Sequence, residues 1–297
     1  MKFSLVIPLA PKRKVEILKS INVLDFSRKN FEVITEEGEN ASRNRNNAIK
    51  KSKGEYVVFL DDDATIEKNY LVLLDNFIKE YPEVGIVGGP QISPKEANFF
   101  QELSGIALTS NFGAFRVNKR YMKKDFSLEG DETSLTSANL CIKKSVLEQI
   151  GNFNENLYPG EDPELIQRAK KSNIKIAYNP EMIIFHKRRE NFISFTKQIF
   201  LYGFVRPTKD KLNQEKKWFF LIPSFFSLYL LFLTTLVLIS KLFILPLLAY
   251  IILAIVFAII DSVQNKKGKF VFFLPFLYLT IHLSYGIGMI GGYFSRK

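Results

Sequence analysis

The chain has 297 residues, of which 47% are hydrophobic and 24% charged, and its formal net charge is +11. This composition excludes a disordered, collagen-like or disulfide-stapled protein. Residues 1–185 carry 26 basic and 26 acidic residues, whereas residues 186–217 carry nine basic against three acidic and residues 218–297 six against one. The positive charge therefore lies beside the apolar segments, which favours a membrane with anionic lipids as the partner and predicts no nucleic-acid binding.

Predicted strands and helices alternate along the first part of the chain. Strands are expected at Phe3–Ile7, Phe31–Thr35, Tyr56–Leu60 and Val84–Gly88, and helices at Val15–Val23, Ala41–Ser52 and Tyr70–Glu80. The apolar run at the N-terminus is too short for a signal peptide, so a first strand explains it better. The alternation predicts a parallel α/β sheet, in which ligands bind beyond the carboxyl ends of the strands.

Two acidic clusters follow predicted strands. Glu36 and Glu37 begin a polar turn, and Asp61, Asp62 and Asp63 end the strand Tyr56–Leu60. Three adjacent carboxylates repel one another, and a hard divalent cation with oxygen ligands relieves that repulsion. The alternative is a solvated turn in which Asp63 caps a helix that starts at Thr65.

Several other kinds of site are excluded by their missing motifs. The sequence has no Gly-x-x-x-x-Gly-Lys run, no Gly-x-Gly-x-x-Gly run, no Cys/His cluster with zinc spacing and no Gly-x-Ser-x-Gly elbow. The lone Cys141 cannot form an intramolecular disulfide, fits a reducing compartment and is expected to be a small buried residue.

Two later positions are candidates for chemistry. Glu161 and Asp162 precede the helical stretch Pro163–Lys171, and a carboxylate at a helix N-terminus is favoured in its ionised form. Asp162 suits a general base if it faces a cleft, and otherwise caps the helix. His186 follows a predicted strand at Met182–Phe185 and is either a ligand or a structural histidine.

Residues 186–217 predict a basic, amphipathic interfacial helix. Phe192, Phe195, Ile199 and Gly203 recur at helical spacing among lysines and arginines. The alternative is a helix packed on the soluble domain.

Three windows that follow are long enough to cross a bilayer core of about 30 Å. They are 218–240, 242–260 and 270–295, and together they form a predicted transmembrane region at 218–297. Only Lys241 separates the first two, so they form a tight hairpin or one of them is re-entrant. A cytoplasmic N-terminal domain puts seven lysines on the inner side, against Lys241, Arg296 and Lys297 outside, in agreement with the positive-inside rule.

The motifs in this order resemble the family 2 glycosyltransferases, which have the GT-A nucleotide-sugar-binding fold. The matching stretches are Phe3–Pro8, Phe31–Ile34, Ala41–Arg45, Gly54–Asp63, Ala138-Asn139, Gly151–Glu155, Gly160–Leu165 and the strand that ends before His186. The tail is similar to membrane-anchored members that act in exopolysaccharide or S-layer glycosylation, at Gln198–Gly203 and His282–Gly288. The resemblance implies a GT-A catalytic domain at 1–185, followed by the interfacial segment and the transmembrane region.

The resemblance also implies a role for each candidate residue. It assigns the binding of the nucleotide sugar to Pro8, Glu36, Glu37, Arg43, Asp61 and Asp62. It assigns the binding of a divalent metal, Mg²⁺ or Mn²⁺, to Asp61, Asp63 and His186. Asp162 corresponds to the catalytic base, with Glu161 beside it. The family usually has Asp at the acidic turn and Gly after the Ala-Arg-Asn arginine, where this chain has glutamates and Asn46-Asn47.

The expected function is an inverting, metal-dependent transfer of one sugar from a nucleotide-diphosphate sugar. The acceptor is a lipid-linked glycan on polyprenyl diphosphate, at the cytoplasmic face of the cell membrane, and the enzyme is a multi-pass membrane protein. The Gln-x-x-Arg-Trp motif of processive synthases is missing, which favours single addition. The alternatives are a transferase that acts on polyprenyl phosphate itself and a catalytically silent membrane scaffold for glycan assembly.

Overall fold

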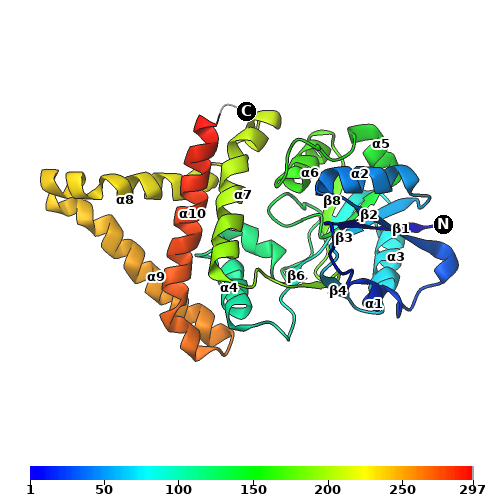
Figure 1. Ribbon diagram of the computed structural model, residues 1–297, viewed down its shortest axis with the longest axis horizontal. Coiled ribbons are helices and arrows are strands. Elements are labelled where there is room, and N and C mark those ends of the chain that lie inside the picture. Colours follow the sequence, from blue (N-terminus) through cyan, green and yellow to red (C-terminus); the bar gives the residue numbers. More distant parts are fainter. Residues whose placement is uncertain (296–297) are drawn as a thin grey trace. The chain divides into compact units, whose positions relative to one another are not determined.

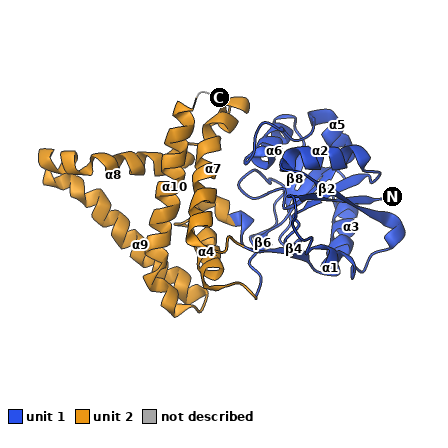
Figure 2. Cartoon of the chain, in the orientation of Figure 1, with its two compact units in different colours: residues 1–95, 119–187 blue, residues 96–118, 188–297 orange. Residues whose placement is uncertain are grey.

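The computed structural model describes residues 1–295, which form two compact units (Figures 1 and 2). Unit 1 comprises residues 1–95 and 119–187, and unit 2 comprises residues 96–118 and the chain from residue 188 onward. The break at 187/188 lies two residues from the predicted domain boundary. Residues 96–118, which were expected within the catalytic domain, instead pack in unit 2.

Unit 1 is an α/β domain with two sheets. Its strands are β1 (Phe3–Leu9), β2 (Phe31–Glu37), β3 (Tyr56–Leu60), β4 (Ala64–Ile66), β5 (Val84–Gly88), β6 (Gln91–Ile92), β7 (Asn139–Lys143), β8 (Lys175–Tyr178) and β9 (Ile184–His186). Its α-helices are α1 (Leu18–Ile21), α2 (Ala41–Lys51), α3 (Tyr70–Glu80), α5 (Lys144–Ile150) and α6 (Glu161–Lys171). The main sheet has the order β2-β1-β3-β7-β5-β8, and a small sheet has the order β4-β9-β6.

The main sheet is mixed, so the prediction of a parallel sheet is wrong at one strand. β1 pairs in parallel with β2 and β3, and β5 in parallel with β8, but β7 is antiparallel to both β3 and β5. Asn139, the first residue of β7, pairs with Leu60, the last residue of β3. β7 thus starts at the edge of the sheet where β3 and β5 end, and it runs in the opposite direction to both strands.

Helices cover both faces of the main sheet, so its strands are buried on both sides. On β3, Tyr56, Val58 and Leu60 pack with α1 and α3, whereas Val57 and Phe59 pack with α2, α5 and α6. This alternation is the two-residue period of a strand. Cys141 in β7 is buried in the first of these clusters, as predicted.

Two local predictions differ from the structure. The helix expected at Val15–Val23 is helical only at Leu18–Ile21, and Glu36 and Glu37 are the last residues of β2 rather than part of a turn. Pro8 and Leu9 pair with Glu36 and Glu37, so the parallel ladder continues two residues further than the apolar pattern indicated. The predicted helix Tyr70–Glu80 is confirmed.

Unit 2 is all helical. It contains α4 (Phe99–Thr109), α7 (Phe192–Leu212), α8 (Ile222–Ile239), α9 (Leu245–Gln264) and α10 (Leu274–Phe294). Within residues 188–295, three segments are long and apolar enough to cross a membrane: Trp218–Ile239, Lys241–Gln264 and Leu274–Phe294. The stripe predicted on α7 is covered within this unit, where Phe195 contacts Phe100 of α4 and Gly203 meets Tyr285 of α10.

Backbone-to-backbone contact joins α7 to α10. A Cβ atom on Gly203, Gly288 or Gly292 would clash with a carbonyl oxygen of the facing helix, at Tyr285, Phe200 and Phe204 respectively. Only glycine allows such an approach, and the short Cα–H to carbonyl contacts that it permits recur at helix–helix interfaces.

Two adjacent glycines of α10 provide a matched test of this packing. We expect Gly292→Ala to destabilise unit 2 by about 1–3 kcal/mol, because a methyl group there overpacks the interface. Gly291→Ala meets only the Phe204 ring at 3.6 Å, an ordinary contact, and gains helix propensity. Thermal unfolding in detergent should therefore give a lower Tm for Gly292→Ala and an unchanged or higher Tm for Gly291→Ala. Equal Tm values for the two variants would contradict the close packing.

Candidate active site

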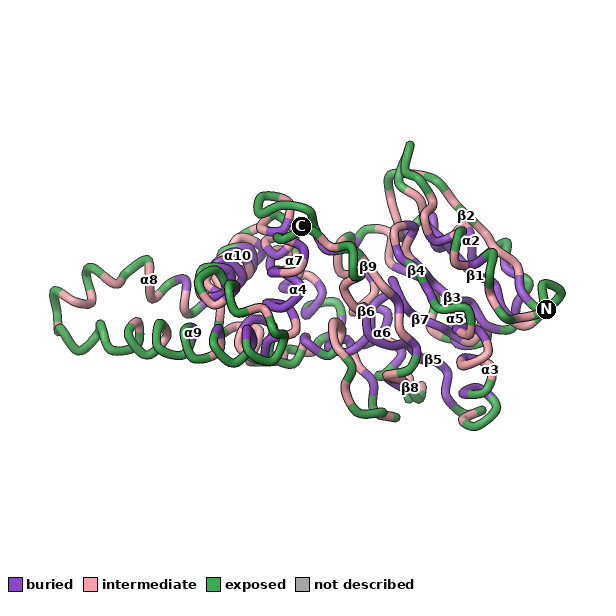
Figure 3. The backbone as a smooth tube through the Cα atoms, turned by 90° about the horizontal axis from the view of Figure 1, so that it is seen from below, coloured by how far each residue is buried: buried purple, intermediate pink, exposed green. Residues whose placement is uncertain are grey.

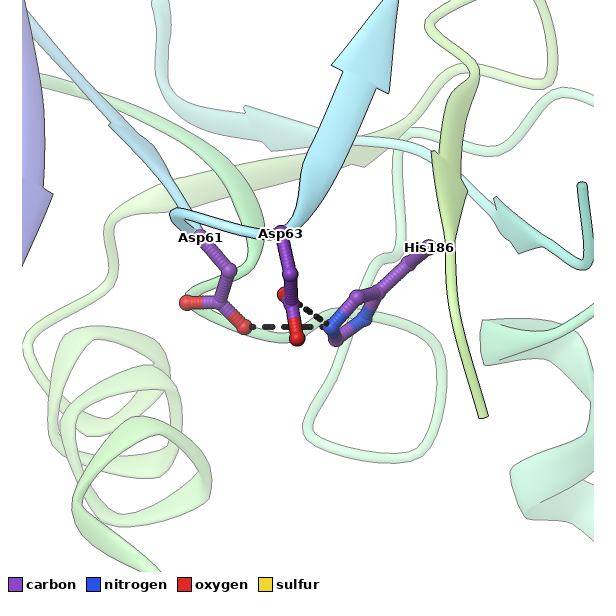
Figure 4. Close-up of side chains that lie close together, drawn as sticks. All are labelled: Asp61, Asp63 and His186. Atoms are coloured by element: carbon purple, nitrogen blue, oxygen red, sulfur yellow. Dashed lines mark ion pairs between the residues drawn. The ribbon is translucent and has the colours of Figure 1, made fainter. Parts of the chain in front are cut away.

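The small sheet brings together residues that are far apart in the sequence. Asp61, Asp62 and Asp63 lie between β3 and β4, and β4 pairs antiparallel with β9 so that Ala64 is opposite His186. His186 Nε2 lies 2.9 Å from Asp63 Oδ1 and 3.7 Å from Asp61 Oδ2 (Figure 4). Because Ala64–Ile66 is a strand, the alternative in which Asp63 caps a helix from Thr65 is wrong.

The other ring nitrogen of His186 is held by Gln91. Gln91 is in β6, which pairs in parallel with β9, and its Oε1 lies 2.8 Å from His186 Nδ1. With Oε1 of Gln91 as the acceptor, Nδ1 carries a proton, and Nε2 is the ring nitrogen directed at the two aspartates. Such an orienting contact is typical of histidines that bind metals.

Asp61, Asp63 and His186 fit a divalent cation. One ligand atom from each lies within 4.8 Å of the others, and all three side chains are half-buried. Two carboxylate oxygens and one imidazole suit Mn²⁺ or Mg²⁺, which leave further positions for water and phosphate oxygens. The carboxylate of Asp63 is ready for this role, because burial raises its pKa but the hydrogen bonds and charges of His186 and Arg13 outweigh burial and hold that pKa well below its usual range.

Arg13 joins the other end of the acidic turn. Its guanidinium lies 2.8 Å from Asp63 Oδ2 and 3.2 Å from Asp62 Oδ1. Asp62 is buried, and burial raises its pKa to about 6 although Arg13 opposes the shift. Its Oδ2 has no hydrogen-bond partner within residues 1–295, so a polar group of a ligand or a water molecule is needed there.

A buried arginine connects the acidic turn to α6. Arg45 in α2 lies 2.8 Å from Glu161 Oε1 and 3.5 Å from Asp61 Oδ1. Both Arg45 and Glu161 are buried, and burial raises the pKa of Glu161 although Arg45 lowers it. Glu161 also accepts the N–H of Gly160 at 2.9 Å, so its carboxylate is engaged in holding the turn before α6.

Asp162 takes a different position from its neighbour. Gly160 has φ +117°, a conformation that favours glycine, and it turns the chain into α6 so that Asp162 lies in the first helical turn. Asp162 is half-buried, and its Oδ2 accepts the N–H of Ser137 at 3.1 Å. The carboxylate is thus oriented by the segment before β7.

The remaining predicted residues lie at the carboxyl ends of β1 and β2 and on α2. Pro8 is buried and pairs with Glu36, Glu36 forms an ion pair with Lys51, and Glu37 accepts the N–H of Lys12 at 3.3 Å. Arg43 is exposed, and its Nε lies 3.0 Å from Glu155. Of the two arginines on α2, Arg45 is the one joined to the acidic turn.

Three residues of this site were missed from the sequence. Arg45 occurs with Ala48 and Ile49 at positions i, i+3 and i+4, the spacing that places it on the buried face of α2. That periodicity was a usable signal. Gln91 and Arg13 had none, because their partners lie 95 and 50 residues away and are reached only through the fold.

The buried pair of Arg45 and Glu161 yields a stability prediction. Arg45→Met leaves Glu161 buried without its cation, so we expect a loss of about 3–5 kcal/mol in the free energy of unfolding of unit 1. Arg43→Met, on the exposed side of the same helix, should change stability by less than about 1 kcal/mol. Adding Glu161→Gln to Arg45→Met should recover part of the loss, and urea unfolding measures all three variants.

Gln91 yields a prediction on metal affinity. Gln91→Leu frees the imidazole of His186 to rotate and change tautomer, so the Kd for Mn²⁺ should rise about 10- to 100-fold. Mn²⁺ titration followed by electron paramagnetic resonance measures this without turnover. Gln149→Leu, at an exposed position of α5, is the control and should bind as the unmodified protein does. Equal Mn²⁺ affinities for the two variants would show that Gln91 does not contribute to metal binding.

The sequence was compared with known families and proteins. The family model "Glycosyl transferase family group 2" matches residues 56–290. A pre-mycofactocin glycosyltransferase of Mycobacterium tuberculosis is 22% identical over 162 residues, which are 54% of this chain and 32% of that protein. The O-antigen chain rhamnosyltransferase WbaN of Salmonella anatum is 29% identical over 168 residues, 56% of this chain and 51% of that protein. The chain thus spans about a third to a half of the length of these curated relatives.

Solved structures share the fold. The mannosyltransferase PcManGT of Pyrobaculum calidifontis, in complex with GDP-Man and Mn²⁺, matches with a TM-score of 0.60 at 12% identity, covering 100% of this chain and 88% of that one. S. aureus TarS 1–349, in complex with UDP-GlcNAc, matches with a TM-score of 0.52 at 18% identity, covering 98% and 91%. The expected GT-A fold is confirmed by this similarity. Because the family model covers well over half of the sequence, from β3 into α10, the chain belongs to glycosyl transferase family group 2.

Proposed function

We propose that the protein is an inverting, metal-dependent glycosyltransferase that moves one sugar from a nucleotide-diphosphate sugar to a lipid-linked acceptor. The observation that carries this proposal is the group formed by Asp61, Asp63 and His186, linked through Arg45 to the turn that presents Asp162. Similar proteins of known structure bind nucleotide sugars, UDP-GlcNAc in one case and GDP-Man with Mn²⁺ in another, which supports the donor class.

The donor is bound at the carboxyl ends of β1, β2 and β3. Pro8, Glu36 and Glu37 lie at the ends of the first two strands, where the nucleotide is proposed to bind with Arg43 nearby. The buried Oδ2 of Asp62 accepts a hydrogen bond from a hydroxyl group of the donor. A divalent ion held by Asp61, Asp63 and His186 would neutralise the charge that develops on the leaving diphosphate.

Asp162 acts as the base. Its carboxylate, oriented by the Ser137 N–H, takes the proton of the acceptor hydroxyl as that oxygen attacks the anomeric carbon. The bond to the diphosphate breaks on the opposite face of the sugar, so the configuration inverts. Glu161 serves this step indirectly, because it is buried against Arg45 and holds the turn on which Asp162 lies.

The acceptor is proposed to be a polyprenyl-diphosphate-linked glycan at the cytoplasmic face of the cell membrane. Three helices long and apolar enough to cross a membrane follow the catalytic unit, and the nine basic residues at 186–217 suit anionic headgroups. The relative that acts on the O-antigen chain is compatible with such an acceptor. The proposal therefore makes the protein a multi-pass membrane protein whose catalytic unit lies on the cytoplasmic side.

The test is nucleotide release in detergent, with UDP- and GDP-sugars, Mn²⁺ or Mg²⁺, and acceptors on polyprenyl diphosphate or polyprenyl phosphate. Release should require the metal and stop with a chelator. Asp162→Asn should lower kcat by about 10²–10⁴-fold, because it removes the base. Asp63→Asn should lower turnover by two or more orders of magnitude, because several kcal/mol of charge stabilisation are lost.

Asp25→Asn is the matched control. It removes one carboxylate of the same unit, from an exposed pair with Lys68, and should turn over as the unmodified protein does. Transfer to polyprenyl phosphate alone would replace the proposed acceptor with the simpler one. No release with any donor, together with no metal-dependent nucleotide binding, would leave the silent scaffold as the function.

A further inference from the structure

Two of the long helices of unit 2 lie side by side. α7 and α10 run next to each other in both views of the chain, and the glycine contacts extend from Phe200 to Phe204 on α7 and from Tyr285 to Gly292 on α10 (Figures 1 and 3). Because the backbones touch, the two helices must lie at the same depth in any membrane. The environment of α7 therefore decides the environment of α10.

α7 is too polar for a bilayer core. Lys197 is exposed in its first half, and Arg206, Lys209 and Asp210 follow in its second half. Arg206 forms an ion pair with Asp210 at 2.7 Å and lies over the ring of Phe220 at 3.6 Å. A lone lysine at the centre of a bilayer is costly, and α7 carries charges along most of its length. An interfacial position, with the helix axis in the plane of the membrane, suits α7, and so it suits α10.

α8 and α9 differ from α10 in their surroundings. Only 11% of the most apolar window of each is buried, against 44% for α10, and the mean hydropathy of that window is 2.1 and 3.0, against 1.3. In Figure 1, α8 runs away from α10 across its direction, and α9 returns obliquely from the turn to α10, where the hydroxyl of Tyr250 lies 2.9 Å from Nδ1 of His282. Transmembrane helices tilt by only about 0–40° from the membrane normal, so α10, which lies across α8 and obliquely to α9, does not cross the bilayer with this pair.

The hairpin has the length and the closed backbone that crossing requires. The apolar segments of 22 and 24 residues correspond to roughly 33–36 Å, enough for a core of about 30 Å. Near the turn, Tyr229 of α8 donates to the carbonyl of Phe243 at 2.8 Å and accepts the N–H of Leu247 at 3.1 Å. Backbone groups at the start of α9 that would otherwise lack partners are thereby satisfied inside the hairpin.

Polar and aromatic residues distinguish the two ends of this hairpin. Trp218, 70% exposed, begins the segment of α8, and Lys266, Lys267 and Lys269 follow α9, all at the end near α7 and α10. The far end carries a single charge, Lys241. Tryptophan prefers the membrane interface, and lysines collect on the cytoplasmic side.

We infer that the α8–α9 hairpin alone crosses the bilayer, and that α7 and α10 lie in the interface on the side from which the hairpin enters. The number of spans is then two, not three, and Ser295 lies on the same side as residues 188–217. Among residues 188–295, this arrangement leaves Lys241 as the only lysine or arginine on the outer side and keeps the seven inner lysines together, in agreement with the positive-inside rule. The inference does not depend on the proposed catalysis.

Cysteine mapping in membrane vesicles of one orientation tests it. Cys141 is buried and is replaced by serine, so that each variant carries one new cysteine. The positions are Lys29 in unit 1, Leu242 at the hairpin turn, Gly268 between α9 and α10, where a Cβ meets nothing within 4 Å, and Ser295 after α10. A membrane-impermeant maleimide is applied to intact and to opened vesicles, and labelling in detergent shows that every cysteine is reactive.

We expect Lys29→Cys, Gly268→Cys and Ser295→Cys to react from one side and Leu242→Cys from the other. Reaction of Ser295→Cys from the side of Leu242→Cys would establish three spans and overturn the inference. Reaction of all four from one side, or no reaction of Leu242→Cys before detergent is added, would show a hairpin that does not cross and would overturn it equally.

A depth measurement distinguishes the helices independently of the turn. Nitroxide labels at Ile252 in α9 and Ile287 in α10, both exposed and both in the middle part of their helices, are compared in lipid vesicles. Two spans place Ile252 deep in the core, accessible to oxygen, and Ile287 near the headgroups, accessible to a polar nickel reagent. Equal depths would contradict the interfacial position of α10.

Discussion

The fold of unit 1 depends on keeping three successive carboxylates together at the end of one strand. Asp61, Asp62 and Asp63 repel one another, and the chain counters that repulsion with two arginines and one imidazole from three different elements. Arg13 approaches from the segment after β1, Arg45 from α2 and His186 from β9. Each of these side chains also has a second contact that fixes it, so the acidic turn is held in one conformation. The carboxylate cluster is therefore a point at which distant parts of the chain are tied together.

The small sheet is as important to the site as the large one. The main sheet delivers the acidic turn, but β4, β9 and β6 deliver the histidine and the glutamine that orients it. These strands have only two or three residues each, and their pairing is set by register: Ala64 opposite His186, and Gln91 opposite Ile184. A one-residue slip in β9 would turn His186 to the other face and away from Asp63.

Much of this arrangement could be read from the sequence because it is local. The strand Tyr56–Leu60, the helix Tyr70–Glu80 and the acidic turn follow from apolar runs and their ends. What could not be read depends on contacts between distant segments. The direction of β7 follows from where the chain re-enters the sheet, and the partner of His186 follows from the pairing of β6 with β9. Glu36 and Glu37 extend β2 because a neighbouring strand pairs with them, although their own residue types predict a turn.

The position of residues 96–118 has a consequence for synthesis and truncation. This segment lies between two parts of unit 1 in the chain, yet Leu103, Ala107 and Leu108 of α4 are buried in unit 2 with helices that are made later. During translation, the apolar face of α4 emerges before α7 and α10 exist to pack with it. A chain that ends at Lys187 would contain the complete catalytic cluster but would carry an uncovered helix, so soluble expression of the catalytic unit requires replacing 96–118 as well as removing the tail.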